Sequence, residues 1–195
     1  METFGQIENH AKKKTLRYRE RDAVQRWLFQ RELHDLRQWC ENVLYLDECG
    51  VDHRLFNPCA RAPRGEAVCA DIPGARCGRT SVISASRGNR LVCPFTFEGH
   101  CNGEVVETYF RDLLLPAIPK GSVVVLDNAS FHGSAALQAL VEASGCFLMF
   151  LPAYSPDLNP IEHIWSALKK HLRDKLPLTE DKRACIDDAC NFFCK

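Results

Sequence analysis

The chain has 195 residues, of which 46% are hydrophobic and 26% are charged, and its formal net charge is zero. These proportions are typical of a soluble globular protein of about one domain and exclude a largely disordered chain. The longest apolar runs are far shorter than the roughly 20 residues that cross a membrane, and the polar N-terminus is unlike a secretory signal. We therefore expect a soluble cytoplasmic protein with no membrane partner.

Eleven cysteines are present, but their number is odd and no CxxC pair occurs. Such a pattern is typical neither of a disulfide framework nor of a zinc site. We interpret the cysteines as reduced and mostly buried small hydrophobic residues.

Residues 1–39 are predicted to form a basic N-terminal arm that ends in a helix. The segment holds nine Lys and Arg against six Asp and Glu. Apolar residues at roughly helical spacing over Asp22–Trp39 predict an amphipathic helix that packs on the rest of the protein. The apolar positions are Val24, Trp27, Leu28, Leu33, Leu36 and Trp39.

Strand and helix patterns alternate over the next region, residues 40–175. The predicted strands are Val43–Leu46, Thr80–Ser86, Leu91–Phe97, Ser122–Leu126 and Phe147–Phe150. The predicted helices run from Asn102 to about Leu115, over Ser134–Ala143, and from an N-cap at Asn159 to about Leu172. In the first of them the inward residues are Val105, Val106, Tyr109, Phe110, Leu113 and Leu114. Residues 57–80 are predicted as a loop or a short exposed hairpin, and residues 176–195 as a C-terminal tail.

The predicted element order is β-β-β-α-β-α-β-α. A hairpin-connected start followed by β-α-β crossovers implies an α/β fold, with a mixed sheet and helices on both faces. This is the order of the ribonuclease H-like fold.

Three carboxylates are predicted to converge at one edge of this sheet. Asp47 and Asp127 each follow a predicted buried strand, at the edge where open α/β sheets place ligands. Glu162 lies in the first turn of the last predicted helix. Three acidic groups at one place repel one another unless divalent cations neutralise them, and Mg²⁺ prefers oxygen ligands. Two such ions support phosphodiester chemistry.

Structural roles remain open for each of these residues. Asp47 and Asp127 are also typical turn residues at strand ends. With Asn159 as N-cap, Glu162 occupies the third helical position and fits a capping box. Asp157 is a rival third ligand, although Ser155-Pro156-Asp157 is typical of a turn.

Three local strings resemble the signature blocks of DDE transposases. They are YLDECG at Tyr45–Gly50, VLDNASFH at Val125–His132 and LPAYSPDLNPIEHIW at Leu151–Trp165. The resemblance is to the IS630 branch of the IS630/Tc1/mariner superfamily and covers about residues 40–175. Thirty-four residues separate Asp127 from Glu162, which is the spacing by which this superfamily is known.

The resemblance implies that Asp47, Asp127 and Glu162 are the catalytic, metal-binding triad. Asp47 would bridge two Mg²⁺ ions, for which Mn²⁺ substitutes, while Asp127 and Glu162 each hold one side. The family cleaves double-stranded DNA at element ends and transfers the freed strands to target DNA, typically at TA sites. The resemblance also implies a homodimer, associated with the nucleoid if its source is bacterial.

Five further residues are predicted to bind DNA. Asn128 and His132 follow the second Asp and are candidates for contacting a phosphate or orienting a ligand. Lys169, Lys170 and Arg173 lie on the helix of Glu162 and are candidates for holding the DNA backbone.

The sequence departs from the family in two respects. Cys49 stands where many relatives carry a small hydroxyl residue. Full-length relatives carry helix-turn-helix modules that about 39 residues cannot hold, so we expect a separate or fused chain to supply them. The alternatives are an inactive remnant that only binds DNA or another subunit, and a host ribonuclease H-like nuclease. The second leaves the long Pro152–Trp165 block unexplained.

Overall fold

The computed structural model describes residues 18–57, 61–69, 78–129 and 132–195. The first 17 residues of the predicted arm, together with Cys59 and Cys77, lie outside the described residues. The nine described cysteines are all free thiols, three of them buried and five half-buried. None of the described helices is both long and apolar enough to cross a membrane.

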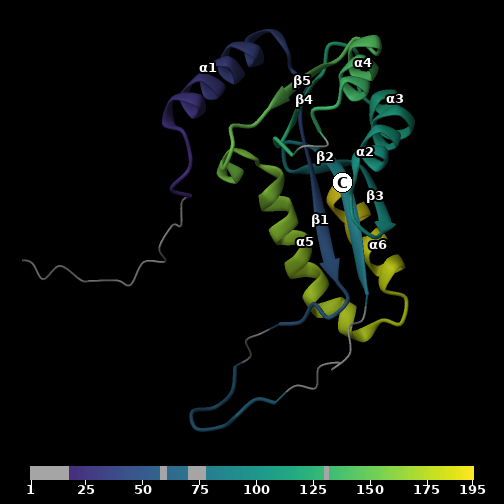
Figure 1. Cartoon of the computed structure of the whole chain (residues 1–195). Helices are drawn as coiled ribbons and strands as arrows, with labels where there is room; N and C mark the ends of the chain where they lie inside the picture. Colours follow the sequence, from purple (N-terminus) through teal and green to yellow (C-terminus); the bar gives the residue numbers. More distant parts are fainter. Residues whose placement is uncertain (1–17, 58–60, 70–77, 130–131) are drawn as a thin grey trace, which may run out of the picture.

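A five-stranded mixed sheet in the order β3-β2-β1-β4-β5 forms the centre of the molecule (Figure 1). β1 pairs antiparallel with β2 and parallel with β4, so it joins the hairpin half of the sheet to the parallel half. The strands are β1 (Val43–Asp52), β2 (Arg79–Arg87), β3 (Arg90–Glu98), β4 (Val123–Leu126) and β5 (Phe147–Phe150). The predicted order of strands and helices is confirmed. In the segment 57–80, the described residues before β2 form an exposed loop with a turn at Arg64-Gly65, and Arg79 and Thr80 already belong to β2.

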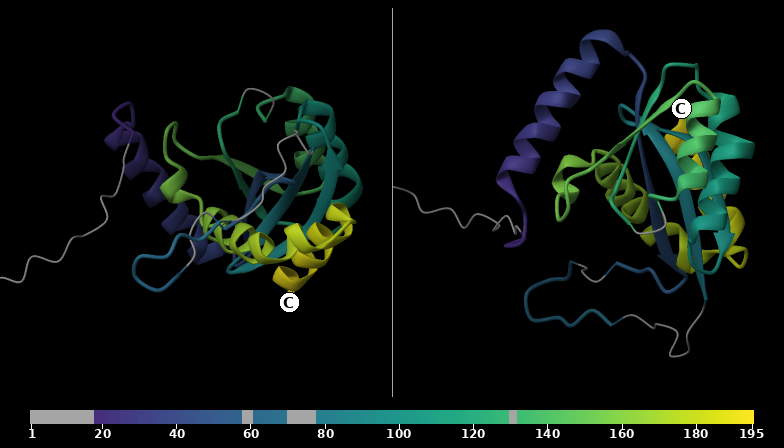
Figure 2. Two further views of the ribbon diagram at one scale, coloured as in Figure 1. Left: turned by 90° about the horizontal axis from the view of Figure 1, so that it is seen from below. Right: turned by 45° about the horizontal axis from the view of Figure 1, so that its top comes forward.

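Helices cover both faces of the sheet (Figure 2). α2 (Gly103–Tyr109), the π-helical segment Phe110–Leu114, α3 (Leu115–Ala117) and α4 (Ala135–Ala143) lie on one face, and α5 (Ile161–Lys175) and α6 (Lys182–Cys194) on the other. Side chains alternate along β1. Leu44 and Leu46 therefore belong to the core between the sheet and α2 to α4, while Tyr45 and Cys49 belong to the core beneath α5.

The C-terminal segment forms α6, which packs on the edge strand β3. Ile186 and Cys190 are buried in the core beneath α5. The Asp187 carboxylate accepts a 2.6 Å hydrogen bond from the Thr96 hydroxyl of β3. Residues 182–194 thus belong to the packed domain and do not project from it as a tail.

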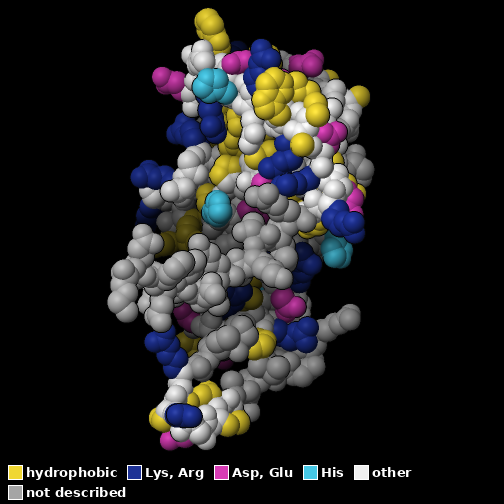
Figure 3. Space-filling model, turned by 90° about the vertical axis from the view of Figure 1, so that its left-hand side faces the viewer, with side chains coloured by type: hydrophobic (Ala, Val, Ile, Leu, Met, Phe, Trp, Pro, Cys, Tyr) yellow, Lys and Arg dark blue, Asp and Glu magenta, His cyan; other side chains and the backbone are white. Residues whose placement is uncertain are grey.

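Two predicted apolar faces were wrong in part. α1 (Ala23–Trp39) has the predicted bounds and is capped by Asp22, but its buried residues are Phe29 and Leu33. The exposed ones are Val24, Trp27, Leu28 and Trp39. The reason is that α1 stands beside the domain (Figure 1), so only one side of it meets the core. Hydrophobic side chains gather near the top of the molecular face shown in Figure 3. In the helix that begins after Asn102, Leu113 is exposed because the π-helical turn shifts the inward position to Leu114.

We expect Leu168→Ala to lower the free energy of unfolding by about 2–5 kcal/mol, because this fully buried α5 side chain fills the core beneath the helix. Urea denaturation at neutral pH measures the change. Leu178→Ala is the matched control, since Leu178 is 86% exposed and its truncation should change stability by no more than about 0.5 kcal/mol. Similar losses for both variants would contradict the packing described above.

Candidate active site

Asp47 and Asp127 lie side by side because β1 and β4 pair in parallel. Tyr45 of β1 is opposite Val125 of β4, so two residues further along Asp47 is level with Asp127. The prediction that both end a strand holds for Asp127 and is wrong for Asp47. β1 continues to Asp52 because β2 pairs with it beyond that point, with Asp47 opposite Ser84.

Glu162 reaches the same place from α5. Asp47 is two residues away from both Tyr45 and Cys49, so it shares their face of β1, which is the face that α5 covers. Glu162 lies in the first turn of α5. All three predicted carboxylates line one cavity of about 530 Å³, whose other walls include Asn159 and the loop from Leu151 to Pro156.

Of the three carboxyl groups, Asp47 has a strongly raised pKa. Burial raises the pKa of its carboxyl to about 7, the hydrogen bond from the Glu48 N–H opposes that rise, and the charges of Glu162, Glu48 and Asp127 add to it. The acidic groups are therefore close enough to repel one another. A cation in the cavity would relieve that repulsion.

Asp127 is held by His132, whose imidazole is fully buried. Its Nδ1 lies 2.6 Å from Oδ1 of Asp127, and its Nε2 lies 3.0 Å from Oε1 of Glu48. Burial disfavours the imidazolium, but the hydrogen bonds to both carboxylates and their charges raise the pKa of His132 to about 10. The His132 hydrogen bond in turn lowers the pKa of Asp127.

Asn159 has a different role from the predicted helix cap. α5 begins one residue later than predicted, after Pro160, and no side chain caps it. The capping box of Asn159 and Glu162 is therefore wrong. The Asn159 Nδ2 donates instead to Oδ2 of Asp47 at 3.4 Å, and its Oδ1 is buried without a hydrogen-bond partner among the described residues. Sequence reasoning missed Asn159 and Glu48 as site residues, although both lie within the quoted motifs.

The rival ligand Asp157 points away from the cavity. Its two carboxylate oxygens accept hydrogen bonds of 2.9 and 2.7 Å from the Arg26 guanidinium of α1. Its side chain is 63% exposed, and it is not among the residues that line the carboxylate cavity. The structure thus gives Asp157 a role in joining α1 to the loop before α5.

The donors around the cavity fit a divalent cation of the Mg²⁺ type. Carboxylate and amide oxygens are the hard ligands that Mg²⁺ and Mn²⁺ prefer, and the unpartnered Oδ1 of Asn159 adds one to the three carboxylates. Among the described residues, no group of three or more His, Cys, Asp or Glu side chains is arranged to hold a metal ion as it stands. It is the chemistry of the donors that fits the ion.

The predicted DNA-binding residues lie in different surroundings. Asn128 is exposed and lines the cavity, whereas His132 is fully buried. Burial leaves His132 unable to touch a phosphate and suited to orienting a ligand. Lys169 and Arg173 are half-buried and follow Glu162 at seven and eleven positions, which places them on the same side of α5. Lys170 is exposed and points about 100° away from Lys169.

A family model described as DDE superfamily endonuclease matches residues 42–184. The chain belongs to this family. The resemblance predicted from the three motifs is therefore confirmed. It is 35% identical over 68 residues to the Tc1 transposase of Caenorhabditis elegans, covering 35% of this chain and 25% of that protein. It is 28% identical over 94 residues to the Tcb2 transposase of Caenorhabditis briggsae, covering 48% and 33% respectively.

A bacterial relative is similar over a larger share of its length. The uncharacterized protein y4pE/y4sA of Sinorhizobium fredii is 30% identical over 102 residues, covering 51% of this chain and 65% of that protein. The matched segments thus span from a quarter to just under two thirds of these relatives.

The fold is that of the Mos1 mariner transposase. A Mos1 paired-end complex with the left transposon end superposes with a TM-score of 0.65 at 14% identity, covering 97% of this chain and 68% of that chain. The Mos1 catalytic domain gives a TM-score of 0.52 at 14% identity, covering 92% and 94%. The predicted ribonuclease H-like fold is confirmed.

We expect the stability of the metal-free protein to depend on the ionisation of Asp47. Its pKa is raised in the folded state from 3.8 to about 7, so its contribution is most favourable below about pH 4 and is lost as the pH rises through 7. Asp47→Asn still accepts the Glu48 N–H but does not ionise. Relative to wild type, the variant should gain on the order of 2 kcal/mol between pH 4.5 and pH 8.

Urea denaturation in EDTA at the two pH values measures this gain. Asp52→Asn, at the exposed end of the same strand, is the control and should show no such gain. If the stability of Asp47→Asn instead changes with pH in parallel with that of wild type, the pKa of Asp47 is not raised in the folded protein.

Proposed function

We propose that this domain is the catalytic part of a transposase that cleaves phosphodiester bonds at the ends of a DNA element and joins the freed ends to target DNA. The observation that carries the proposal is the meeting of Asp47, Asp127 and Glu162 at one cavity, from two strands and a helix start. The membership of the DDE superfamily endonucleases supports it. The motifs favour the IS630 branch and insertion at TA sites.

In this proposal the three carboxylates hold two Mg²⁺ ions, or Mn²⁺ in their place. Mos1, which has the same fold, forms paired-end complexes with either metal. When bound, such ions activate an attacking oxygen and stabilise the leaving one. The residues of the chain orient the ligands: Asn159 donates to Asp47, and His132 contacts Asp127.

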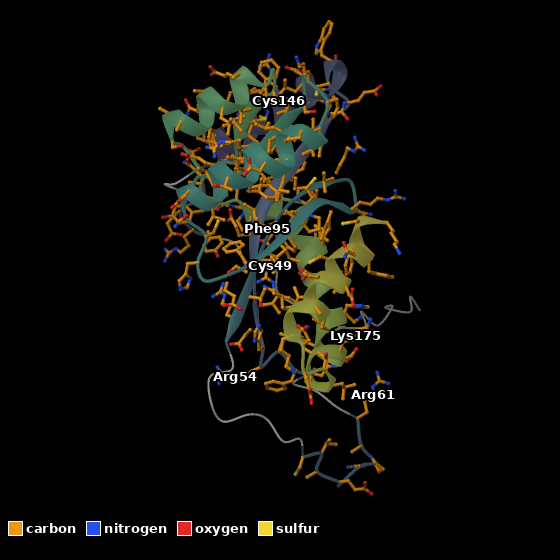
Figure 4. The ribbon with its side chains drawn as sticks, turned by 90° about the vertical axis from the view of Figure 1, so that its right-hand side faces the viewer. Cys49, Arg54, Arg61, Phe95, Cys146 and Lys175 are labelled. Carbon is orange, nitrogen blue, oxygen red and sulfur yellow. The ribbon has the colours of Figure 1, made fainter. Side chains whose placement is uncertain are left out.

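Double-stranded DNA is the proposed substrate and binds along the side of α5 that carries Glu162. Lys169 lies beside the Cys49 thiol of β1, whose pKa is raised by burial against the opposing charge of Lys169. Figure 4 shows Cys49 on β1 and Lys175 at the end of α5. Cations along this side would neutralise backbone phosphates next to the cavity. Asn128, at the mouth of the cavity, is a further candidate for a phosphate contact.

The remaining expectations follow from the transposase assignment. Residues 40–175 would form the catalytic region, working as a homodimer in the cytoplasm and with helix-turn-helix modules from a separate or fused chain. An inactive remnant is not favoured, because all three carboxylates are retained and line one cavity.

We expect Asp127→Asn and Glu162→Gln each to lower Mg²⁺-dependent cleavage by at least about 100-fold, because each removes a charged oxygen donor. The measurement is nicking of DNA that carries the element ends, in Mg²⁺ and in Mn²⁺. Asp157→Asn is the matched control and should leave cleavage within about threefold, since Asp157 bonds Arg26 instead. Activity that survives in Glu162→Gln and is lost in Asp157→Asn would exchange their roles.

We expect Lys169→Ala and Arg173→Ala each to weaken DNA binding about equally for all sequences and to reduce the slope of log affinity against log salt by about one. Fluorescence anisotropy from 50 to 200 mM NaCl measures both. Lys170→Ala, on the neighbouring side of α5, should have the smaller effect. An equal effect of all three variants would mean that DNA does not follow the Glu162 side of the helix.

A further inference from the structure

Glu48, His132 and Asp127 form a continuous chain of contacts from β1 to the end of β4. His132 is fully buried and lies between two carboxylates, 2.6 Å from Asp127 and 3.0 Å from Glu48. The Glu48 side chain is 18% exposed, and its Oε1 also accepts a 3.6 Å hydrogen bond from the Cys101 thiol. Hydrogen bonds on both sides of a buried imidazole fix the orientation of the groups that it joins.

Glu48 itself is separated from the carboxylate cavity. Side chains alternate along β1, so Glu48 points to the opposite side from Asp47. It is not among the residues that line the cavity. The Glu48 side chain is instead linked to Asp127 by hydrogen bonds through His132.

The contacts at Asp127 select one of its oxygens. Asp127 comes directly after β4, where the sheet no longer restrains the chain, and its side chain is half exposed. Both the His132 Nδ1 and the Ala129 N–H bond to Oδ1, at 2.6 and 3.2 Å. Within the described residues this leaves Oδ2 as the oxygen that is available to the cavity.

We propose that Glu48 and His132 are positioning residues, which hold the Asp127 carboxylate with Oδ2 turned toward the cavity. The inference rests on the proposed function in that Asp127 is taken as a ligand of a divalent cation. Carboxylates that bind metals are commonly oriented by such partners, and loss of a partner typically lowers metal affinity by about 10–100-fold. The hydrogen-bond acceptor at position 48, more than its charge, is what the chain of contacts requires.

The test is Mn²⁺ binding to the metal-free protein, measured by calorimetry, with thermal unfolding in EDTA to show that each variant folds. We expect Glu48→Ala to weaken Mn²⁺ binding by about tenfold or more. Glu48→Gln, which still accepts from His132, should stay within about threefold of wild type. His132→Asn donates to Asp127 but is too short to reach Glu48, so it should resemble Glu48→Ala and repeats the test if that variant does not fold.

A double-mutant cycle separates positioning from a general loss of negative charge. In the Asp127→Asn background, Glu48→Ala should have no further effect on Mn²⁺ affinity, because the residue through which it acts is altered. Asp52→Asn, on the same side of β1, is the control for charge alone and should leave affinity unchanged. Equal affinities for Glu48→Ala and wild type, or an undiminished Glu48→Ala effect without Asp127, would overturn the proposal.

The same measurements distinguish this proposal from the transposase function. A wild-type protein that binds Mn²⁺ through Asp127 but does not nick DNA would refute the proposed function and leave the positioning role supported. A wild type that binds no Mn²⁺ would overturn both.

Discussion

The parallel pairing of β1 with β4 is the interaction on which the candidate active site depends. It sets Asp47 level with Asp127 at the point where β4 ends and β1 continues. A one-residue slip would turn Asp47 to the other face of the sheet, away from α5. The buried valines of β4 and the apolar residues of β1 specify this register from both sides, because each face of the sheet has its own core.

The same arrangement brings like charges together. Packing α5 against β1 brings Glu162 to the cavity that the two aspartates line. The pKa of Asp47 is raised mainly by its burial, and the charges of the neighbouring carboxylates add to that rise. The fold answers this repulsion differently at each residue. Asp127 has a cationic imidazole beside it, whereas Asp47 has only an amide and a backbone N–H among its described hydrogen-bond donors. The need for an external cation is therefore greatest at Asp47.

The sequence predicted the element order well, because buried β-branched runs and helix caps are local signals. Asn102 and Ser134 cap α2 and α4 as their residue types indicate. Motif and spacing also predicted that Asp47, Asp127 and Glu162 converge, and the structure brings them to one cavity. The sequence could not decide between two hydrogen-bonding roles for which one side chain is equally suited. Asn159 was equally suited to capping α5 and to bonding Asp47, and only the packing of α5 against β1 decided between them.

Other failures have the same origin in tertiary contacts. Periodicity located α1 but could not say which of its apolar residues meet the domain, because that depends on the angle at which the helix docks. His132 was predicted to contact a phosphate or to orient a ligand. Its burial between Asp127 and Glu48 depends on the meeting of β4 with β1, which the pattern of a single strand does not reveal.

The ion pair between Arg26 and Asp157 joins segments that are 131 positions apart in the chain. Two parallel hydrogen bonds fix direction as well as distance, so this contact sets the angle at which α1 meets the loop before α5. Pro156, the neighbour of Asp157, lines the carboxylate cavity. One wall of the cavity is thus tied to the N-terminal helix as well as to the sheet.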